Sequence, residues 1–254
     1  MSNKIIFKSE GNIGTILLNN PQKLNAFDFE MVKEFGSIIS KIEKSNLKVV
    51  VIRGAGKSFC SGGDVQWEVT LADLDTKKVR RQIEFIQNVL SKIQTLPQIF
   101  IAVIHGYAVG GGNQLAMACD MRIASSAARF AHPEITLGTV PPLGATKRLP
   151  RLIGLGRAKY MLFTGEPIDS STALEWGLVD FVVPEKEIDS FLNDLLSRID
   201  SKPKKALALI KESLNRNYLA DFQDQFELNC YVKCSRSKEF KEVLKNFVEK
   251  RKKP

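Results

Sequence analysis

The sequence contains little of what metal sites, disulfide frameworks and membrane spans require. It has two histidines, His105 and His132, and four cysteines, none of which form a Cys-x-x-Cys pair. Because zinc sites need such residues clustered at short spacing, we expect no metal site. No apolar run reaches the ~18 residues of a membrane span, and the N-terminus has no signal-peptide pattern. We therefore expect a cytoplasmic protein that has no contact with a membrane.

The composition is that of a globular protein with excess positive charge. Of 254 residues, 44% are hydrophobic and 26% are charged, and the net charge is +9. Lys and Arg outnumber Asp and Glu from Arg198 onward, and the chain ends in a basic run, 250–253. This pattern is typical of a solvated helical face, or of a surface that attracts a polyanionic ligand such as a nucleotide phosphate. Without a recognised nucleic-acid-binding motif, we do not expect nucleic acid as a partner.

The hydropathy pattern predicts an α/β fold. Ile5–Lys8 and Thr15–Leu18 alternate like the strands of a hairpin, and Val49–Ile52 and Ile99–Ile104 are unbroken apolar runs. Apolar residues at helical spacing predict a helix from Thr76 to about Leu96. Strands that alternate with helices at this spacing favour a largely parallel sheet.

The chain divides near Asp200. After Pro184 the pattern is helical to the end, and no internal repeat or low-complexity linker interrupts the chain. We predict a core domain over residues 1–200 and a helical region over residues 201–254. The segment from Trp67 to about Val79 contains no recognisable motif.

One short motif resembles a nucleotide-binding loop and is rejected. Gly56-Lys57-Ser58 matches the end of a P-loop, but that loop needs a glycine where this chain has Val51. We therefore exclude a nucleoside triphosphatase.

Two glycine-rich turns each follow a buried strand. Ser61-Gly62-Gly63 comes after Val49–Ile52, and Gly110-Gly111-Gly112 comes after Ile99–Ile104. Glycine lets the backbone approach a ligand closely, and a helix N-terminus offers unpaired N–H groups to negative charge. Farther along the chain, Glu134 stands among apolar residues. Together these features predict a turn that stabilises an oxyanion and a catalytic carboxylate.

The same segments resemble the crotonase (enoyl-CoA hydratase/isomerase) superfamily. The matching segments occur in the family's order, as Phe59-Cys60-Ser61-Gly62-Gly63-Asp64, Gly106-Tyr107-Ala108-Val109-Gly110-Gly111-Gly112, Ala118-Cys119-Asp120-Met121-Arg122-Ile123-Ala124, Pro133-Glu134, Leu137-Gly138, Thr164-Gly165 and Gly177-Leu178-Val179-Asp180. The resemblance implies an α/β spiral of ββα units with a C-terminal helical region that assembles trimers or hexamers. It also implies an acyl-CoA substrate, with coenzyme A as part of the substrate rather than a separate cofactor.

The resemblance also assigns residues to roles. The backbone N–H groups of Ser61 and Gly111 would hold the thioester oxygen. The loop that would contact coenzyme A contributes Lys23, Leu24 and Ala26. The glycine turns would add further substrate contacts, from Ser61, Gly62, Gly63, Asp64, Gly110 and Gly111.

Gln114 departs from the pattern of the family's hydratases. Those enzymes have a glutamate at this position and another where this chain has Glu134. An amide can orient water but is not a general base, a role worth about 10²–10⁴ in rate. One glutamate suffices to move a proton between two carbons, so the resemblance favours a double-bond isomerase of 3-enoyl-CoA.

Two other functions stay open. The first is a hydratase, or another crotonase reaction, in which Gln114 orients water. The second is a catalytically silent module that binds coenzyme A or nucleic acid, against which the intact glycine turns and Glu134 argue.

Overall fold

The computed structural model describes residues 4–219 and 225–251 of the chain. The last residues of the basic C-terminal run, Lys252 and Lys253, lie outside the described residues. Within the described ranges, no helix is both long enough and apolar enough to cross a membrane.

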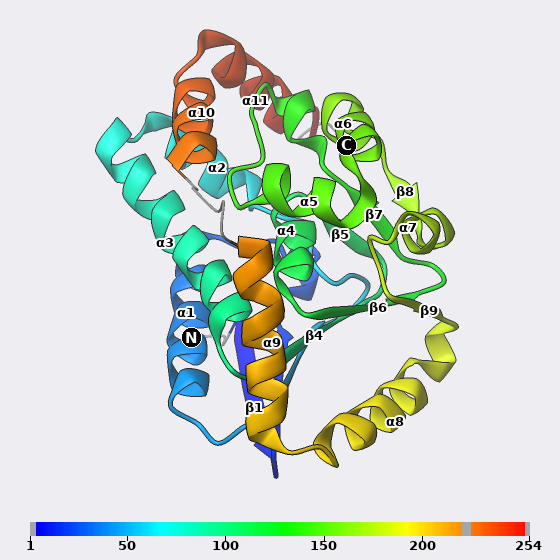
Figure 1. Ribbon diagram of the computed structural model, residues 1–254. Helices are drawn as coiled ribbons and strands as arrows, with labels where there is room; N and C mark the ends of the chain where they lie inside the picture. Colours follow the sequence, from blue (N-terminus) through cyan, green and yellow to red (C-terminus); the bar gives the residue numbers. More distant parts are fainter. Residues whose placement is uncertain (1–3, 220–224, 252–254) are drawn as a thin grey trace.

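The core is a six-stranded sheet in the order β1-β2-β3-β4-β6-β9 (Figure 1). Only β1 and β2 pair antiparallel, and the other neighbours are parallel. The predicted hairpin and the largely parallel sheet are therefore confirmed. The bounds of these strands are β1 Ile5–Glu10, β2 Ile13–Leu18, β3 Val49–Gly54, β4 Ile99–Ile104, β6 Met121–Ser125 and β9 Phe181–Val183.

A second, three-stranded sheet has the order β5-β7-β8 and contains Tyr107–Val109, Arg129–Ala131 and Ile168–Asp169. Single bridges from Cys60 to Ala108 and from Phe27 to Gly63 extend it toward the earlier part of the chain. Each repeating unit of the chain therefore consists of a strand of the large sheet, a short extended segment and a helix. This repetition is the spiral of ββα units that the resemblance implies.

Helices surround both sheets. Several begin at an aspartate N-cap: Asp28 accepts a hydrogen bond from Met31 N at 2.9 Å, and Asp75 accepts one from Lys78 N at 2.9 Å. The helices of the core are α1 Phe29–Glu43, α2 Val65–Asp73, α3 Thr76–Thr95, α4 Gly111–Ala118, α5 Ala145–Ile153, α6 Leu155–Thr164, α7 Ser170–Trp176 and α8 Ile188–Asp200, with the short 3-10 helices η1 Pro21–Lys23, η2 Pro133–Leu137 and η3 Glu185–Glu187.

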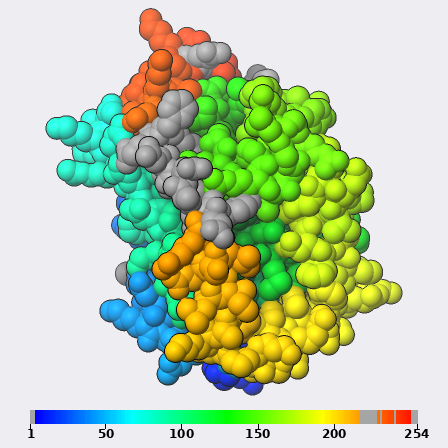
Figure 2. Space-filling model, viewed as in Figure 1, coloured from blue at the N-terminus to red at the C-terminus, as the bar shows by residue number. Residues whose placement is uncertain are grey.

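Three further helices follow residue 200: α9 Lys204–Leu219, α10 Gln225–Ser235 and α11 Lys238–Arg251. Helix α9 lies across the sheet, and in the space-filling view its surface meets that of α8 along the lower part of the molecule (Figures 1 and 2). Buried Leu228 and Tyr231 of α10 join the main core. The predicted helical region therefore packs directly on the first 200 residues.

Several elements escaped prediction from the sequence. The pattern indicated neither helix α2 nor strands β5, β6 and β7. The missed strands are five residues or fewer, so they give little periodicity to read. Helix α2 has a weak amphipathic pattern, with only Leu71 and Ala72 buried. It is the most consequential omission, because it forms a wall of the pocket.

Candidate active site

A pocket of about 690 Å³ brings together every site residue expected from the sequence. Its floor is made by the two glycine turns, and α2, α3, η2 and the C-terminal helices α10 and α11 supply its walls. The expected residues that line it are Lys23, Leu24, Ala26, Ser61, Gly62, Gly63, Asp64, Gly110, Gly111, Gln114 and Glu134.

The two glycine turns contact each other through their backbones. Gly62 has φ of +95°, and a Cβ added there would lie 2.8 Å from Val109 O and 3.3 Å from Gly111 N. Only glycine permits both this conformation and this approach. The turns that follow β3 and β5 therefore converge on one point, as the sequence pattern predicted.

The two expected oxyanion donors differ in their hydrogen bonds. Gly111 is the first residue of α4, and no group in the described part of the chain accepts a bond from its N–H. Ser61 N donates to Leu24 O at 3.0 Å. A thioester oxygen at this position must therefore share or replace the Leu24 carbonyl as acceptor.

The carbonyl of Leu24 is held by an unusual backbone conformation. Leu24 and Asn25 are non-glycine residues with positive φ, +51° and +58°. Such residues persist where the surrounding structure fixes them. Here the buried Asn25 side chain donates to Ala55 O at 2.8 Å and Ser58 O at 2.7 Å. These bonds tie the expected coenzyme A loop to the segment that leads into the first glycine turn.

Gln114 is bonded directly to Glu134. Its Nε2 donates to Glu134 Oε1 at 3.0 Å, while its Oε1 accepts from Leu143 N at 2.7 Å and from Ala145 N at 3.3 Å. The amide is 1% exposed, so water does not compete for these bonds. Gln114 therefore orients the Glu134 carboxylate and has its own oxygen occupied by backbone.

A buried arginine fixes the backbone that holds Gln114. Arg148 Nη1 donates to Leu143 O at 2.7 Å, and its Nε and Nη2 donate to Gln94 Oε1 at 3.0 and 2.7 Å. The chain of hydrogen bonds from Gln94 to Glu134 thus links α3 to the Glu134 carboxylate.

His132 lies behind Glu134 rather than in the pocket. Its side chain is fully buried, with Nδ1 3.5 Å from Glu134 Oε1 and Nε2 3.1 Å from Asn113 Nδ2. It does not line the pocket, so it lies next to Glu134 without facing a substrate.

Asp64 and Lys23 form an ion pair at the pocket rim. Asp64 is the N-cap of α2, where its Oδ1 accepts from Gln66 N at 2.8 Å. The carboxylate is 6% exposed and the Lys23 ammonium 53%. Lys23 is therefore placed to meet an anionic ligand, but Asp64 offsets part of its charge.

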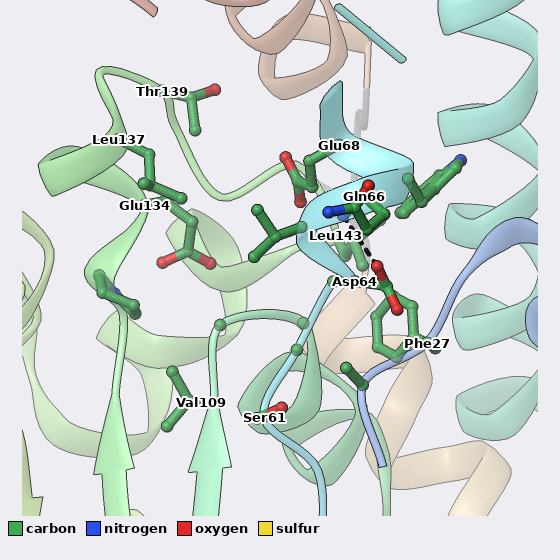
Figure 3. A pocket seen from close by; sticks show the side chains of 18 of the residues that line it. Phe27, Ser61, Asp64, Gln66, Glu68, Val109, Glu134, Leu137, Thr139 and Leu143 are labelled. Atoms are coloured by element: carbon green, nitrogen blue, oxygen red, sulfur yellow. Dashed lines mark hydrogen bonds between the residues drawn. The ribbon is translucent and has the colours of Figure 1, made fainter. Parts of the chain in front are cut away.

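The pocket contains a second glutamate that the sequence pattern did not reveal. Glu68, on the first turns of α2, lies across the pocket from Glu134, with Leu143 between them (Figure 3). Burial, and to a lesser extent the negative charge of Glu134, raises the pKa of Glu68 from 4.5 to about 7. Reading Asp64 as an N-cap would have predicted a helix that begins at Val65. It would not have shown which face of that helix meets the pocket.

Comparison with known proteins confirms the family. The sequence model of the enoyl-CoA hydratase/isomerase family matches residues 8–254. The chain belongs to this family. It is 35% identical to the short-chain-enoyl-CoA hydratase of Clostridium acetobutylicum, over 98% of this chain and 96% of that one. It is therefore an enzyme of the crotonase superfamily, as the resemblance implied.

Solved structures of this family share the fold. The crystal structure of enoyl-CoA hydratase from Bacillus halodurans has a TM-score of 0.90 at 25% identity, covering 96% of this chain and 99% of that one. An enzyme from Thermobifida fusca, described as a putative enoyl-CoA hydratase in complex with acetoacetyl-CoA, has a TM-score of 0.78 at 27% identity, covering 92% and 94%. The crotonase fold predicted from the sequence is confirmed.

Proposed function

We propose that this crotonase binds a 3-enoyl-CoA thioester and moves its double bond to the 2-position, without a cofactor beyond the coenzyme A of the substrate. The observation that carries this proposal is the Gln114–Glu134 hydrogen bond. Hydration needs a group that activates water, and the oxygen of Gln114 is already bonded to Leu143 N and Ala145 N. Glu134 is then the proton acceptor next to the oxyanion turn.

The proposed reaction begins with removal of a proton from C2. The carboxylate of Glu134 takes this proton, and the electron pair of the C–H bond passes into a dienolate. Its negative oxygen is held by the N–H groups of Gly111 and Ser61, the latter exchanging its bond to Leu24 O. Loss of one such donor typically costs about 2.7–4 kcal/mol of transition-state stabilisation. A proton delivered to C4 then completes the shift.

The coenzyme A portion is proposed to run past the Lys23–Ala26 loop. Lys23 lies at the rim with half of its side chain exposed, which suits a phosphate group. The Thermobifida fusca relative is described in complex with acetoacetyl-CoA, which supports an acyl-CoA ligand for this pocket as well.

Hydration of a 2-enoyl-CoA is the second candidate. Several relatives carry that name, among them the Clostridium acetobutylicum protein. Glu68 also provides a second carboxyl in the pocket, which hydration could use in place of a glutamate at position 114.

A direct assay separates the two candidates. The purified enzyme is given 3-enoyl-CoA and 2-enoyl-CoA, and the products are resolved by chromatography and mass. Isomerisation predicts conversion of the first substrate with no change in mass. The gain of a water molecule as the main outcome from 2-enoyl-CoA would show that the enzyme is a hydratase.

Glu134→Gln tests the catalytic carboxylate in the same assay. We expect kcat to fall by about 10²–10⁴ because the general base is lost, with little change in KM. Glu166→Gln, which removes a carboxylate from an exposed residue outside the pocket, is the matched control. Wild-type activity in Glu134→Gln would remove this residue from the mechanism.

We also propose a homotrimer or homohexamer. Large apolar side chains are exposed on α6 and α9, where Phe163 is 71% exposed and Leu214 is 67% exposed. Exposed apolar surface of this kind marks protein–protein contacts. Sedimentation equilibrium of the purified protein would test this, and a monomer at micromolar concentration would refute it.

A further inference from the structure

Glu68 and Glu134 occupy equivalent places on the two glycine turns. A Cβ added at Gly63 would lie 2.5 Å from Glu68 Oε1, and one added at Gly110 would lie 3.4 Å from Glu134 Oε1. One carboxyl therefore stands over each turn. Glu134 and Glu68 lie on opposite sides of the pocket (Figure 3). Because the turns touch where their N–H groups are expected to hold the thioester, an acyl group bound there would extend between the two carboxyls.

The wall around Glu68 offers it no protein partner. Apolar side chains make up much of the pocket lining, among them Trp67, Ile83 and Leu143. No residue in the described ranges gives the Glu68 carboxyl a hydrogen bond or an ion pair. The titratable groups that act on it are Glu134, from η2, and buried Tyr231, from α10.

Such a placement is costly for the folded protein. A partly buried carboxyl without a protein partner loses part of its hydration with no hydrogen bond in return, and groups of this kind concentrate at functional sites. Nearby Asp64 shows the structural alternative, since its carboxylate caps α2 and pairs with Lys23. Glu68 does neither, so its role lies with what the pocket binds.

We propose that Glu68 is the second proton-transfer residue of this site and delivers the proton to C4 after Glu134 has removed the proton from C2. This inference rests on the isomerase function proposed above. The Glu68 carboxylic acid gives its proton to C4, the C3–C4 double bond becomes single, and the C2–C3 double bond forms. Glu134 ends protonated and Glu68 ionised, and exchange with water at the pocket mouth restores both.

The proton form of Glu68 is available at neutral pH. With a pKa of about 7, about half of these carboxyls carry a proton near pH 7. Above that pH the proton donor is lost. The rate of isomerisation should therefore fall as the pH rises above 7 in the wild-type enzyme.

Glu68→Gln tests the inference, with Asp73→Asn as the matched control, because Asp73 is an exposed carboxylate on the same helix. The amide keeps the size of the side chain and removes the proton it delivers. We expect kcat for 3-enoyl-CoA to fall about 10²–10⁴-fold with little change in KM. The fall in rate above pH 7 should also disappear, whereas Asp73→Asn should keep the wild-type rate and pH profile.

Isotope transfer gives a second readout. A 3-enoyl-CoA with deuterium at C2 is converted in ordinary water, and the product is analysed for deuterium at C4. Two-residue transfer predicts hydrogen from water at C4. Deuterium carried from C2 to C4 by the wild-type enzyme would show that Glu134 returns the proton itself and would overturn the inference.

The outcomes separate the two proposals. Isomerisation that is unaffected in rate and pH profile by Glu68→Gln overturns the role of Glu68 and leaves the isomerase function standing. A wild-type enzyme that does not isomerise 3-enoyl-CoA overturns the proposed function and the role of Glu68 together.

Discussion

Two pairs of charged side chains, one structural and one in the pocket, show opposite uses of charge in this protein. Asp120, which directly precedes β6, and Lys211 of α9 form an ion pair, whereas Glu68 and Glu134 face each other across the pocket and repel when ionised. The first pair is surrounded by partners. In the second pair, Glu134 Oε2 and the Glu68 carboxyl have no partner in the described part of the chain.

The ion pair is fully satisfied by the protein. Lys211 Nζ donates to Ile93 O at 2.8 Å, to Gln98 O at 2.7 Å and to Asp120 Oδ2 at 2.7 Å, and Asp120 also accepts from Phe100 N at 2.7 Å. Burial raises the pKa of Asp120 and lowers that of Lys211, and their mutual attraction opposes both shifts. This pair holds the C-terminal region on the sheet, and neither residue lines the pocket.

The two glutamates lack such compensation. Gln114 donates one bond to Glu134, and no described residue donates one to Glu68. The paired charges thus stabilise the fold, whereas the two pocket carboxyls are the groups that we propose transfer protons. Three substitutions test this difference.

Lys211→Met should have the largest effect on stability. Leaving Asp120 buried without its counter-ion costs about 3–5 kcal/mol of the free energy of unfolding, measured by urea denaturation. Lys205→Met, which removes an exposed lysine from the same helix, should change it by less than about 0.5 kcal/mol. The double variant Asp120→Asn with Lys211→Met should recover part of the loss. Equal stability of wild type and Lys211→Met would mean that the pair does not hold α9 in place.

Gln114→Glu should have the next largest effect, on the type of reaction. The new carboxylate can still accept from Leu143 N and Ala145 N, but it no longer donates to Glu134, so the two oxygens can hold water between them. Hydration of 2-enoyl-CoA should rise by about 10²-fold or more because a general base is gained. Gln66→Glu adds the same charge at the pocket lining and serves as the control. Unchanged hydration would show that position 114 does not limit this reaction.

Glu68→Gln should have the smallest effect, on the pH dependence of stability. Because the pKa of Glu68 is raised from 4.5 to about 7 on folding, the folded protein binds this proton more tightly than the unfolded chain does. Ionisation of the Glu68 carboxyl therefore destabilises the folded protein, and this destabilisation is absent below pH 4.5 and complete above pH 7. We therefore expect Glu68→Gln to stabilise the protein by about 1–2 kcal/mol at pH 8, allowing for partial solvent exposure, and by much less at pH 5. A gain that is the same at both values would contradict the raised pKa.

The sequence predicted the core elements and most of the site. Val49–Ile52 and Ile99–Ile104 are apolar runs, and the segments beside them have a clear helical period. This alternation of strands and helices predicted a parallel sheet, and the two strands pair in parallel in the structure. Ser61, Gly111, Gln114 and Glu134 were identified from motifs, and all four line one pocket. Their assigned roles stay predictions.

Other parts of the site could not be predicted because they depend on contacts between distant segments. The bond from Ser61 N to Leu24 O joins residues that are 37 positions apart. The bonds that occupy Gln114 Oε1 come from Leu143 and Ala145, which follow it by about thirty residues. No local pattern carries such information.

The sequence by itself determined the family, the two glycine turns and the glutamate beside them, because these features depend on local backbone freedom and on residue identity. Only the tertiary structure decided that Gln114 holds Glu134 and that Glu68 faces it. Helix α2 could have presented Glu68 to solvent, and its placement follows from how α2 packs between the glycine turn and α11. The surroundings of a carboxyl set its proton affinity, and those surroundings exist only in the folded chain.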